Sequence, residues 1–181
     1  YSIDRTPAQA PQLRRKPSRT INMSRLGRVL EEVQDPPIRA LFIYNCNPVA
    51  TAPDQGRVVA ALRRDSLFTV VHEQLWTDTC DWADIILPAT TFLEHTDLCR
   101  SYGGYALQYL EPVIPPAGEA RTNHATFGAL AKVLGYDEPE FSESEEGIAR
   151  KLVTDFDRLK RERILPVRRP IVFGDTFPSR G

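Results

Sequence analysis

The stretch at residues 77–95, "TDTCDWADIILPATTFLEH", decides how this chain folds. Thr77 can cap a brief helical segment, and Asp78 in its first turn suits the positive end of a helix. The following segment "DIILP" (84–88) is a short apolar run, typical of a strand that is buried on both faces. Pro88 has no N–H to continue a hydrogen-bond ladder, so the strand should end there. The stretch therefore predicts a short helix that leads quickly into a central strand.

Two apolar runs upstream have the same character. "IRALFIY" (38–44) and "LFTVVHE" (67–73) are rich in branched and aromatic residues and are short enough for buried strands. Capping signals and helical periodicity predict helices that begin at Ser24 and near Pro53 and others over 122–135 and 142–162, with a peripheral fourth strand at 104–110. Alternating strands and helices predict an α/β protein, a Rossmann-like three-layer domain with a mainly parallel sheet flanked by helices.

Length and composition suit one globular domain with tails, since the chain has 181 residues of which 41% are hydrophobic. Residues 1–20 are rich in Pro and Arg and predict a linker or strap, residues 21–165 the domain, and residues 166–181 a connector towards a further C-terminal domain. The chain begins without Met and ends "FGDTFPSRG", so we expect a piece of a longer protein.

Charge and cysteine content exclude several classes of function. A net charge of −1 gives no electrostatic reason to expect nucleic acid or an anionic membrane as a partner. The longest apolar run is far shorter than the ~20 residues that cross a bilayer. The three cysteines show no C-x-x-C spacing, which predicts free thiols rather than a disulfide, zinc or iron–sulfur site. Free thiols favour a cytoplasmic location.

Polar residues follow the first two predicted strands, where ligands collect in open parallel sheets. Asn47-Pro48 predicts a tight turn after the first strand, and His72 and Glu73 end the second. The carboxylate of Glu73 can accept a hydrogen bond from a ribose hydroxyl or from a base N–H. The alternative for Glu73 is a surface ion pair with an Arg.

Glu94 and His95 should reach the same edge after the third strand. General acid–base chemistry is one reading of such a pair, but a polar loop contact is favoured. No Gly-x-Gly-x-x-Gly motif or P-loop follows the first strand, so a nucleotide would bind through another loop. "HEQLW" is not a zinc-protease motif, because Trp76 stands where the second His is required.

Several segments together resemble molybdopterin oxidoreductases of the dimethyl sulfoxide reductase family. The likeness covers about residues 20–181, and its most specific block is 69–95, in which the strand-end acid, the T-D-T step and "ADIILPA" follow in the family's order. The other segments are "INMSRLGRVL" (21–30), "LFIYNCNPVATAPDQ" (41–55), "PPAGEARTNHATFGALAKVLG" (115–135) and "FGDTFPSRG" (173–181).

The resemblance implies that this chain is the second of two Rossmann-like domains, each of which holds one molybdopterin guanine dinucleotide. By motif position, Asn47 and Pro48 match the family's N-P loop, against which a nucleotide portion packs. His72 and Glu73 match a pair, usually ending in Asp, that contacts the guanosine end. His95 matches a residue near the cofactor that follows the third strand.

Asn123, at the start of the long helix, matches an Asp or Asn contact of the family. The implied function is part of a molybdenum or tungsten oxidoreductase with a bis-molybdopterin guanine dinucleotide cofactor (Mo-bis-MGD), acting by two-electron redox of a small substrate. The remaining domains of the same enzyme and an electron-transfer protein are the implied partners. The segments for a [4Fe–4S] cluster, the metal ligand and the C-terminal domain are absent from these residues, so we expect this piece alone to be inactive. The alternative is a non-catalytic Rossmann-like module that binds another nucleotide or a protein.

Overall fold

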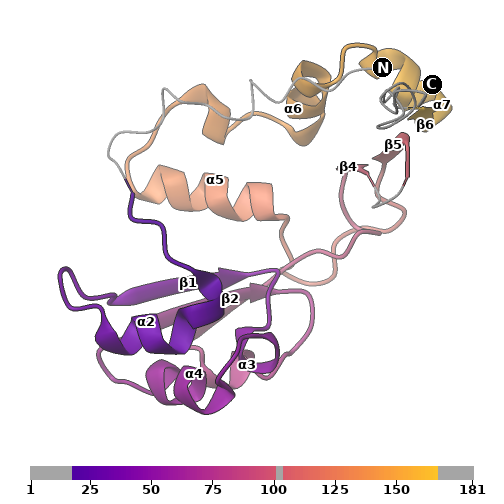
Figure 1. Cartoon of the computed structure of the whole chain (residues 1–181). Helices are drawn as coiled ribbons and strands as arrows, with labels where there is room; N and C mark the ends of the chain where they lie inside the picture. The colour runs from indigo at the N-terminus through magenta and orange to yellow at the C-terminus, as the bar shows by residue number, and fades with distance from the viewer. Residues whose placement is uncertain (1–17, 101–103, 167–181) are drawn as a thin grey trace, which may run out of the picture. The chain divides into compact units, whose positions relative to one another are not determined.

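The computed structural model describes residues 18–100 and 104–166 (Figure 1). The described chain divides into two compact units. We call residues 18–91 and 116–123 the parallel-sheet unit, and residues 92–100, 104–115 and 124–166 the antiparallel unit. The sequence predicts one domain over 21–165, and the structure differs because the chain after the third strand builds a separate core. The predicted linker at 1–20 and connector at 166–181 lie almost wholly outside the described residues.

The parallel-sheet unit contains the three strands that the sequence predicts. They are β1 (Ala40–Tyr44), β2 (Phe68–Glu73) and β3 (Ile85–Pro88), in the order β1-β2-β3. Both neighbouring pairs are parallel, and Ile43 lies opposite Val71, which in turn lies opposite Ile86. The predicted α/β class and the parallel sheet are therefore confirmed.

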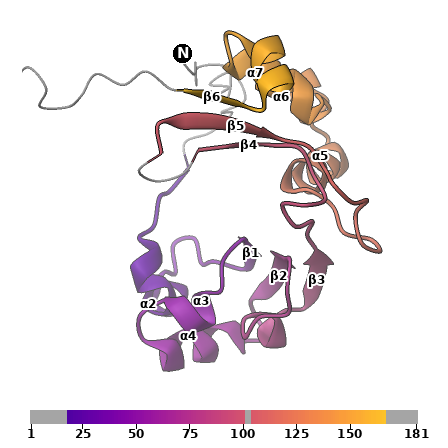
Figure 2. The ribbon, with the colours of Figure 1, turned by 90° about the vertical axis from the view of Figure 1, so that its right-hand side faces the viewer.

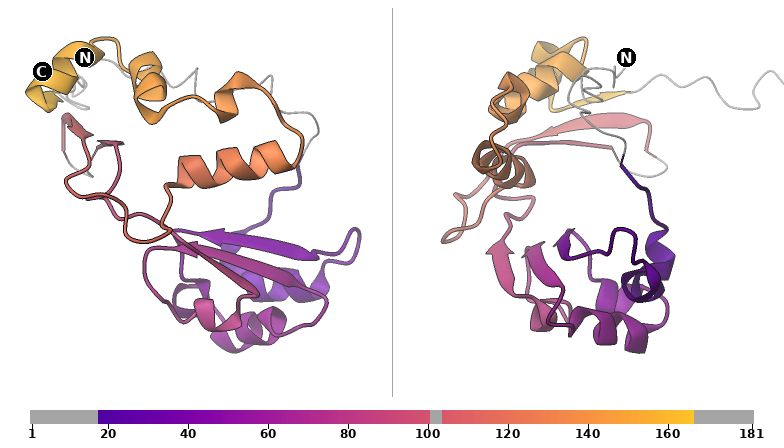
Figure 3. Two further views of the ribbon diagram at one scale, coloured as in Figure 1. Left: turned by 180° about the vertical axis from the view of Figure 1, so that it is seen from behind. Right: turned by 90° about the vertical axis from the view of Figure 1, so that its left-hand side faces the viewer.

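The helices of this unit cover one face of its sheet (Figures 2 and 3). Because β1, β2 and β3 are adjacent in chain order and parallel, right-handed connections return on the same side. The segments on this side are η2 (Met23–Arg25), α2 (Leu26–Glu32), α3 (Pro48–Thr51), α4 (Gln55–Leu62) and η3 (Cys80–Trp82). They enclose a core of Leu30, Ile43, Val49, Val58, Ala61, Leu62, Leu67, Val71 and Cys80.

Local details of these helices depart from the capping predictions. Ser24 does not cap; the side chain of Asn22 accepts its N–H at 3.0 Å instead. The short helix predicted to begin at Thr77 is the 3₁₀ turn η3, whose N-cap position is Thr79 without a side-chain capping bond. The hydroxyl of Thr79 is used elsewhere, in a contact between two loops that the sequence pattern does not reveal.

The antiparallel unit has its own sheet, in the order β4-β5-β6, and four helical segments. The predicted peripheral strand at 104–110 exists as β5, but it pairs with antiparallel neighbours rather than with the parallel sheet. The predicted helix at 142–162 is two helices, α6 and α7, that meet at a break. The elements are β4 (Asp97–Cys99), β5 (Ala106–Leu110), α5 (Asn123–Val133), η4 (Pro139–Phe141), α6 (Glu145–Leu152), α7 (Phe156–Glu162) and β6 (Ile164–Pro166).

The core of the antiparallel unit lies between α6, α7 and the strands. Leu107, Leu159 and Leu165 are each at most 2% exposed, and the rings of Tyr109 and Phe156 meet edge to face with centroids 5.3 Å apart. This second core explains why the two units separate. None of the helices in the described ranges is both long enough and apolar enough to span a bilayer.

Candidate functional site

The parallel strands end together along one edge of the sheet. We call this edge the carboxyl rim; it comprises residues 44–48, 73–79 and 88–91. The segment before α5 joins the rim, because the N–H of Arg121 donates to the carbonyl oxygen of Pro88 at 3.1 Å and the bridge formed there is parallel. Asn123 lies two residues further along, beyond the same edge. The structure therefore brings Asn47, Glu73 and Asn123 to one edge of the sheet, as the sequence predicts.

The side chain of Asn47 links the first two loops of the rim. Its Oδ1 accepts a hydrogen bond from the hydroxyl of Thr79 at 2.7 Å, and its Nδ2 donates to a carboxylate oxygen of Asp78 at 3.2 Å. The hydroxyl of Thr79, which is fully buried, also accepts the N–H of Val49 at 3.2 Å. Pro48 is buried and begins α3. Asn47 thus sets the spacing of two loops, a role that sequence reasoning missed; its contact with a cofactor stays a prediction.

Glu73 ends the central strand; its backbone is hydrogen-bonded, and one of its two carboxylate oxygens accepts a hydrogen bond. Its carbonyl oxygen accepts the N–H of Ala89 at 3.0 Å, and its Oε1 accepts the N–H of Gln74 at 2.8 Å. Among the described residues, no Arg forms an ion pair with Glu73, so the surface ion pair considered above is not found there. The Glu73 side chain is half-buried, and its second oxygen remains available as a hydrogen-bond acceptor.

His72 points to the other face of the sheet. Successive side chains of a strand alternate between faces, so His72 is opposite to Val71, which faces the helices, and to Glu73. The His72 ring is fully buried, and its Nδ1 lies 3.1 Å from the carbonyl oxygen of Leu87. A carbonyl can only accept, so Nδ1 carries the proton and the lone pair of Nε2 faces a buried space. Within the described residues Nε2 has no hydrogen-bond partner.

His95 belongs to the antiparallel unit, together with the buried Glu94. Its predicted place beside the rim residues therefore stays a prediction. The predicted pair of His72 and Glu73 is adjacent in the chain but diverges in space, because alternation directs the two side chains to different faces.

Trp76 is an exposed aromatic residue on the rim that sequence reasoning did not select as a binding residue. Its side chain is 72% exposed, beside Leu75 at 75%. The indole N–H donates to a carboxylate oxygen of Asp81 at 2.7 Å, which fixes one edge of the ring. The signal available in the sequence was an apolar pair within an otherwise polar strand-end loop.

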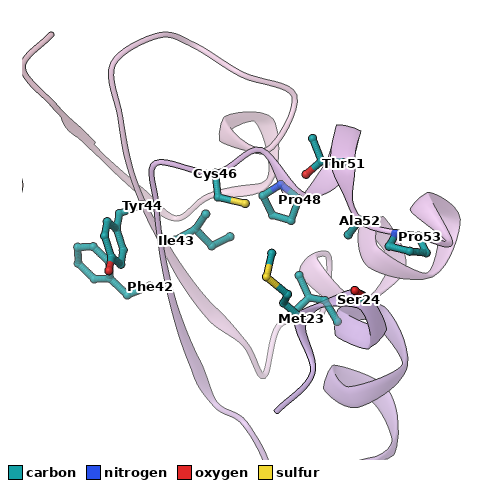
Figure 4. Close-up of a pocket in the computed structure, with 11 residues that line it drawn as sticks. Met23, Ser24, Phe42, Ile43, Tyr44, Cys46, Pro48, Thr51, Ala52 and Pro53 are labelled. Atoms are coloured by element: carbon teal, nitrogen blue, oxygen red, sulfur yellow. The ribbon is translucent and has the colours of Figure 1, made fainter. Parts of the chain in front are cut away.

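An apolar hollow of about 390 Å³ opens beside the end of β1 (Figure 4). Met23, Ile43, Cys46 and Pro48 point into a common space, and Ser24 and Thr51 stand at its side. Its volume falls in the range of small-molecule sites, which are concave and mostly apolar. The sequence could not reveal this hollow, because η2 and the loop after β1 come from separate segments.

No metal site is formed by the described part of the chain. Within residues 18–100 and 104–166, there is no group of three or more His, Cys, Asp or Glu side chains that could hold a metal ion. Cys46, Cys80 and Cys99 are free thiols, and Cys80 is buried. The chemistry of the rim is therefore that of hydrogen-bond acceptors, an aromatic surface and an apolar hollow.

Comparison with known proteins identifies the family. A family model described as Molybdopterin oxidoreductase matches residues 14–133, which is more than half of the chain. A probable oxidoreductase of Bacillus subtilis (strain 168), YoaE, is 39% identical over 167 residues, covering 87% of this chain and 24% of the relative. This chain belongs to the molybdopterin oxidoreductase family. The resemblance seen in the block at 69–95 is thereby confirmed.

Other relatives and a solved structure agree with membership of the molybdopterin oxidoreductase family. Trimethylamine-N-oxide reductase of Haemophilus influenzae is 36% identical over 110 residues, covering 59% of this chain and 13% of the relative. Acetylene hydratase from Pelobacter acetylenicus matches the structure with a TM-score of 0.70 at 20% identity, over 86% of this chain and 22% of that chain; this likeness shows the fold. The chain spans about a quarter or less of the length of these proteins.

Proposed function

We propose that this chain is part of a molybdenum or tungsten oxidoreductase, and that its carboxyl rim binds the guanosine end of one molybdopterin guanine dinucleotide. Family membership supports a molybdopterin cofactor and a redox role for the full-length protein. The observation that carries the guanosine assignment is Glu73, whose carboxylate stands at the end of the central strand. The two loops beside it are held together by Asn47 and Thr79.

The side chains of the rim fit a guanine nucleotide by their hydrogen-bonding chemistry. Guanine presents N1–H and a 2-amino group side by side as donors, and a carboxylate can only accept. Glu73 uses one oxygen within the chain and has the other available. On the opposite face of the sheet, the buried Nε2 of His72 is an acceptor without a partner among the described residues, and a buried acceptor without a partner is costly. A donor from another segment of the longer protein, or from another part of the cofactor than the base at Glu73, would relieve that cost.

The residues of this chain bind and orient rather than react. Glu73 accepts from the base, Asn47 holds the loop positions, and Asn123 offers an amide at the start of α5. When bound, the metal and its pterins supply the two-electron redox chemistry. No residue of this chain is assigned a catalytic or metal-ligating role. The other dinucleotide, the metal ligand and an iron–sulfur cluster would be supplied by the remaining domains of the same enzyme.

The test is the guanine content of the full-length protein, measured after acid release together with its molybdenum and tungsten. We expect wild-type protein to contain guanine nucleotide, and the variant Glu73→Ala to retain less than a tenth of it. Glu31→Gln is the matched control, because Glu31 is an exposed carboxylate of the same unit that pairs with Arg57 away from the rim. Wild-type guanine and metal content in Glu73→Ala would overturn the proposal.

A further inference from the structure

The loop after β2 exposes a large aromatic surface at the carboxyl rim. Trp76 is 72% exposed, and its indole combines a large apolar surface with one N–H donor. Trp76 follows Glu73 by three residues, so the indole and the carboxylate belong to the same short loop. The exposed ring and the group that we propose as the guanine acceptor therefore belong to the same part of the rim, residues 73–79.

The indole of Trp76 is held in place rather than free to rotate. Its N–H donates to Asp81 at 2.7 Å, and Asp81 lies in η3 between the buried Cys80 and Trp82. The hydrogen bond uses the one polar atom of the ring and leaves the faces of the ring open. A ring fixed by its edge loses little conformational entropy when a flat ligand lies against its face.

The second tryptophan of the chain shows the contrasting use. Trp82 is half-buried and packs against the core, with the guanidinium of Arg63 5.5 Å from its ring centroid. Within the described residues, the Trp82 ring therefore packs against both the core and a guanidinium group. Trp76 has a hydrogen-bonded edge and an exposed face, an arrangement that suits stacking of a flat ligand on the ring.

We propose that Trp76 is the stacking surface for the guanine base at this rim, with the carboxylate of Glu73 accepting from N1–H and the 2-amino group. This inference rests on the proposed function and adds the residue that provides affinity for the ring. Stacking on an aromatic side chain does not distinguish the bases, whereas a carboxylate favours guanine over adenine, which presents an acceptor at N1. The two residues would thus divide affinity and specificity between them.

The test uses the full-length protein freed of cofactor, with GMP as the probe and AMP as its control in equilibrium dialysis. We expect GMP to bind more tightly than AMP, and Trp76→Ala to weaken GMP binding about 5- to 150-fold, the range for one lost base–aromatic stack. Trp76→Phe, which keeps a ring, should stay within about threefold of wild type. Leu75→Ala is the matched control, because Leu75 is equally exposed and should change nothing.

A residue-specific readout separates stacking from burial by other parts of the longer protein. Hydroxyl-radical footprinting should oxidise Trp76 in the nucleotide-free protein, and GMP should protect it more than AMP does. Protection of Trp76 before nucleotide is added would mean that another segment covers it, and that result overturns the inference.

The outcomes also separate this inference from the function on which it rests. If wild type binds GMP and Glu73→Gln weakens it, but Trp76→Ala binds as tightly as wild type, the stacking role fails and the guanosine site stands. If wild type does not bind GMP at all, the proposed function fails and the stacking role with it. Urea unfolding of Trp76→Ala, expected to match wild type, excludes loss of fold as the cause.

Discussion

The first two loops of the carboxyl rim are joined by hydrogen bonds of the Asn47 amide, whereas the helices of the antiparallel unit are joined by ion pairs. On the rim, the amide of Asn47 and the hydroxyl of Thr79 meet at 2.7 Å, and Thr79 is fully buried. In the antiparallel unit, Glu146 of α6 pairs with Lys160 of α7 at 2.7 Å on the surface. The bond between Asn47 and Thr79 joins two neutral groups and does not depend on pH or salt, whereas exposed ion pairs do. The Asn47–Thr79 contact should therefore keep its geometry under conditions of pH and salt that loosen α6 and α7.

The largest expected loss of stability in the parallel-sheet unit follows from the close contact of α2 with α4. A Cβ at Gly27 would lie 2.8 Å from the backbone N of Val58 and 2.9 Å from the backbone C of Arg57. Neither backbone atom can rotate away, so Gly27→Ala should force the helices apart and destabilise the parallel-sheet unit by about 1–3 kcal/mol. Urea unfolding followed by tryptophan fluorescence measures this, since both tryptophans lie in that unit.

The matched control is Gly56→Ala in α4. A Cβ at Gly56 would meet nothing within 4 Å, and alanine is the better helix former by roughly 0.5–1 kcal/mol. Gly56→Ala should therefore be neutral or stabilising. Equal effects of the two substitutions would contradict the close helix contact.

The next largest loss of stability should follow removal of the hydrogen bond between Asn47 and Thr79. Asn47→Ala removes the acceptor for Thr79 and the donor to Asp78, and should cost about 1–2 kcal/mol of the free energy of unfolding. Thr79→Val should cost a similar amount, because it also leaves the N–H of Val49 without its acceptor.

A double-mutant cycle tests whether the two residues act through one contact. We expect a coupling energy of about 0.5–3 kcal/mol, the range for residues in direct contact, that stays the same from low to high salt. Additive effects of the two substitutions would show that the link contributes nothing to stability. A coupling energy that falls steeply with salt would show that the Asn47–Thr79 contact is as sensitive to salt as the ion pairs of α6 and α7.

The parallel strands were predictable because burial on both faces leaves a continuous apolar run, which local sequence shows directly. The sheet to which 104–110 belongs was not, because β5 pairs with 164–166 far along the chain and no local pattern encodes that register. The break between α6 and α7 was also invisible, since no Pro or Gly marks it; Val153 is buried in the core at that point.

The candidate site was predictable to the extent that it follows from topology. The ends of parallel strands must meet, and this rule alone placed Asn47 and Glu73 together. The contact of Asn47 with Thr79 joins residues from different loops, and only the fold brings them together. Alternation along the strand predicts that His72 and Glu73 face opposite sides of the sheet. The family motif instead assigned both residues to one contact.

A smaller and reversible effect should follow a drop in pH. Hydrogen bonding to Lys160 holds the pKa of Glu146 below its ordinary value of 4.5, and Arg163 does the same for Glu111. Because the folded pKa values are lowered, the stabilisation is fully present above pH 4.5 and is lost as the pH falls through the folded values. Hydrogen exchange should quicken in peptides from 145–162 at pH 4 relative to pH 7, after correction for the intrinsic rate.

Peptides from 55–73 of the parallel-sheet unit provide the internal control and should keep their protection over this range. The matched variant is Glu146→Gln, which should reproduce part of the loosening of 145–162 at pH 7 and reduce the response to acid. Loss of protection in 55–73 before 145–162 would show that acid loosens the parallel-sheet unit first, contrary to the prediction.

The smallest effect concerns Cys46 and Cys80, two thiols of the parallel-sheet unit that report its local packing. Cys80 is 2% exposed within the core of the parallel-sheet unit, whereas Cys46 lines the hollow beside β1 and is half-buried. A thiol reagent must reach the sulfur, so N-ethylmaleimide should modify Cys46 at least about tenfold faster than Cys80, because Cys80 reacts only when its core opens. Peptide mass spectrometry of the full-length protein measures both rates. The variant Gly27→Ala should speed the reaction of Cys80 and leave that of Cys46 nearly unchanged, because only Cys80 depends on opening of the core. Modification of Cys80 as fast as Cys46 in wild type would show that this core is not closed, and the fixed rim that depends on it would then lack its support.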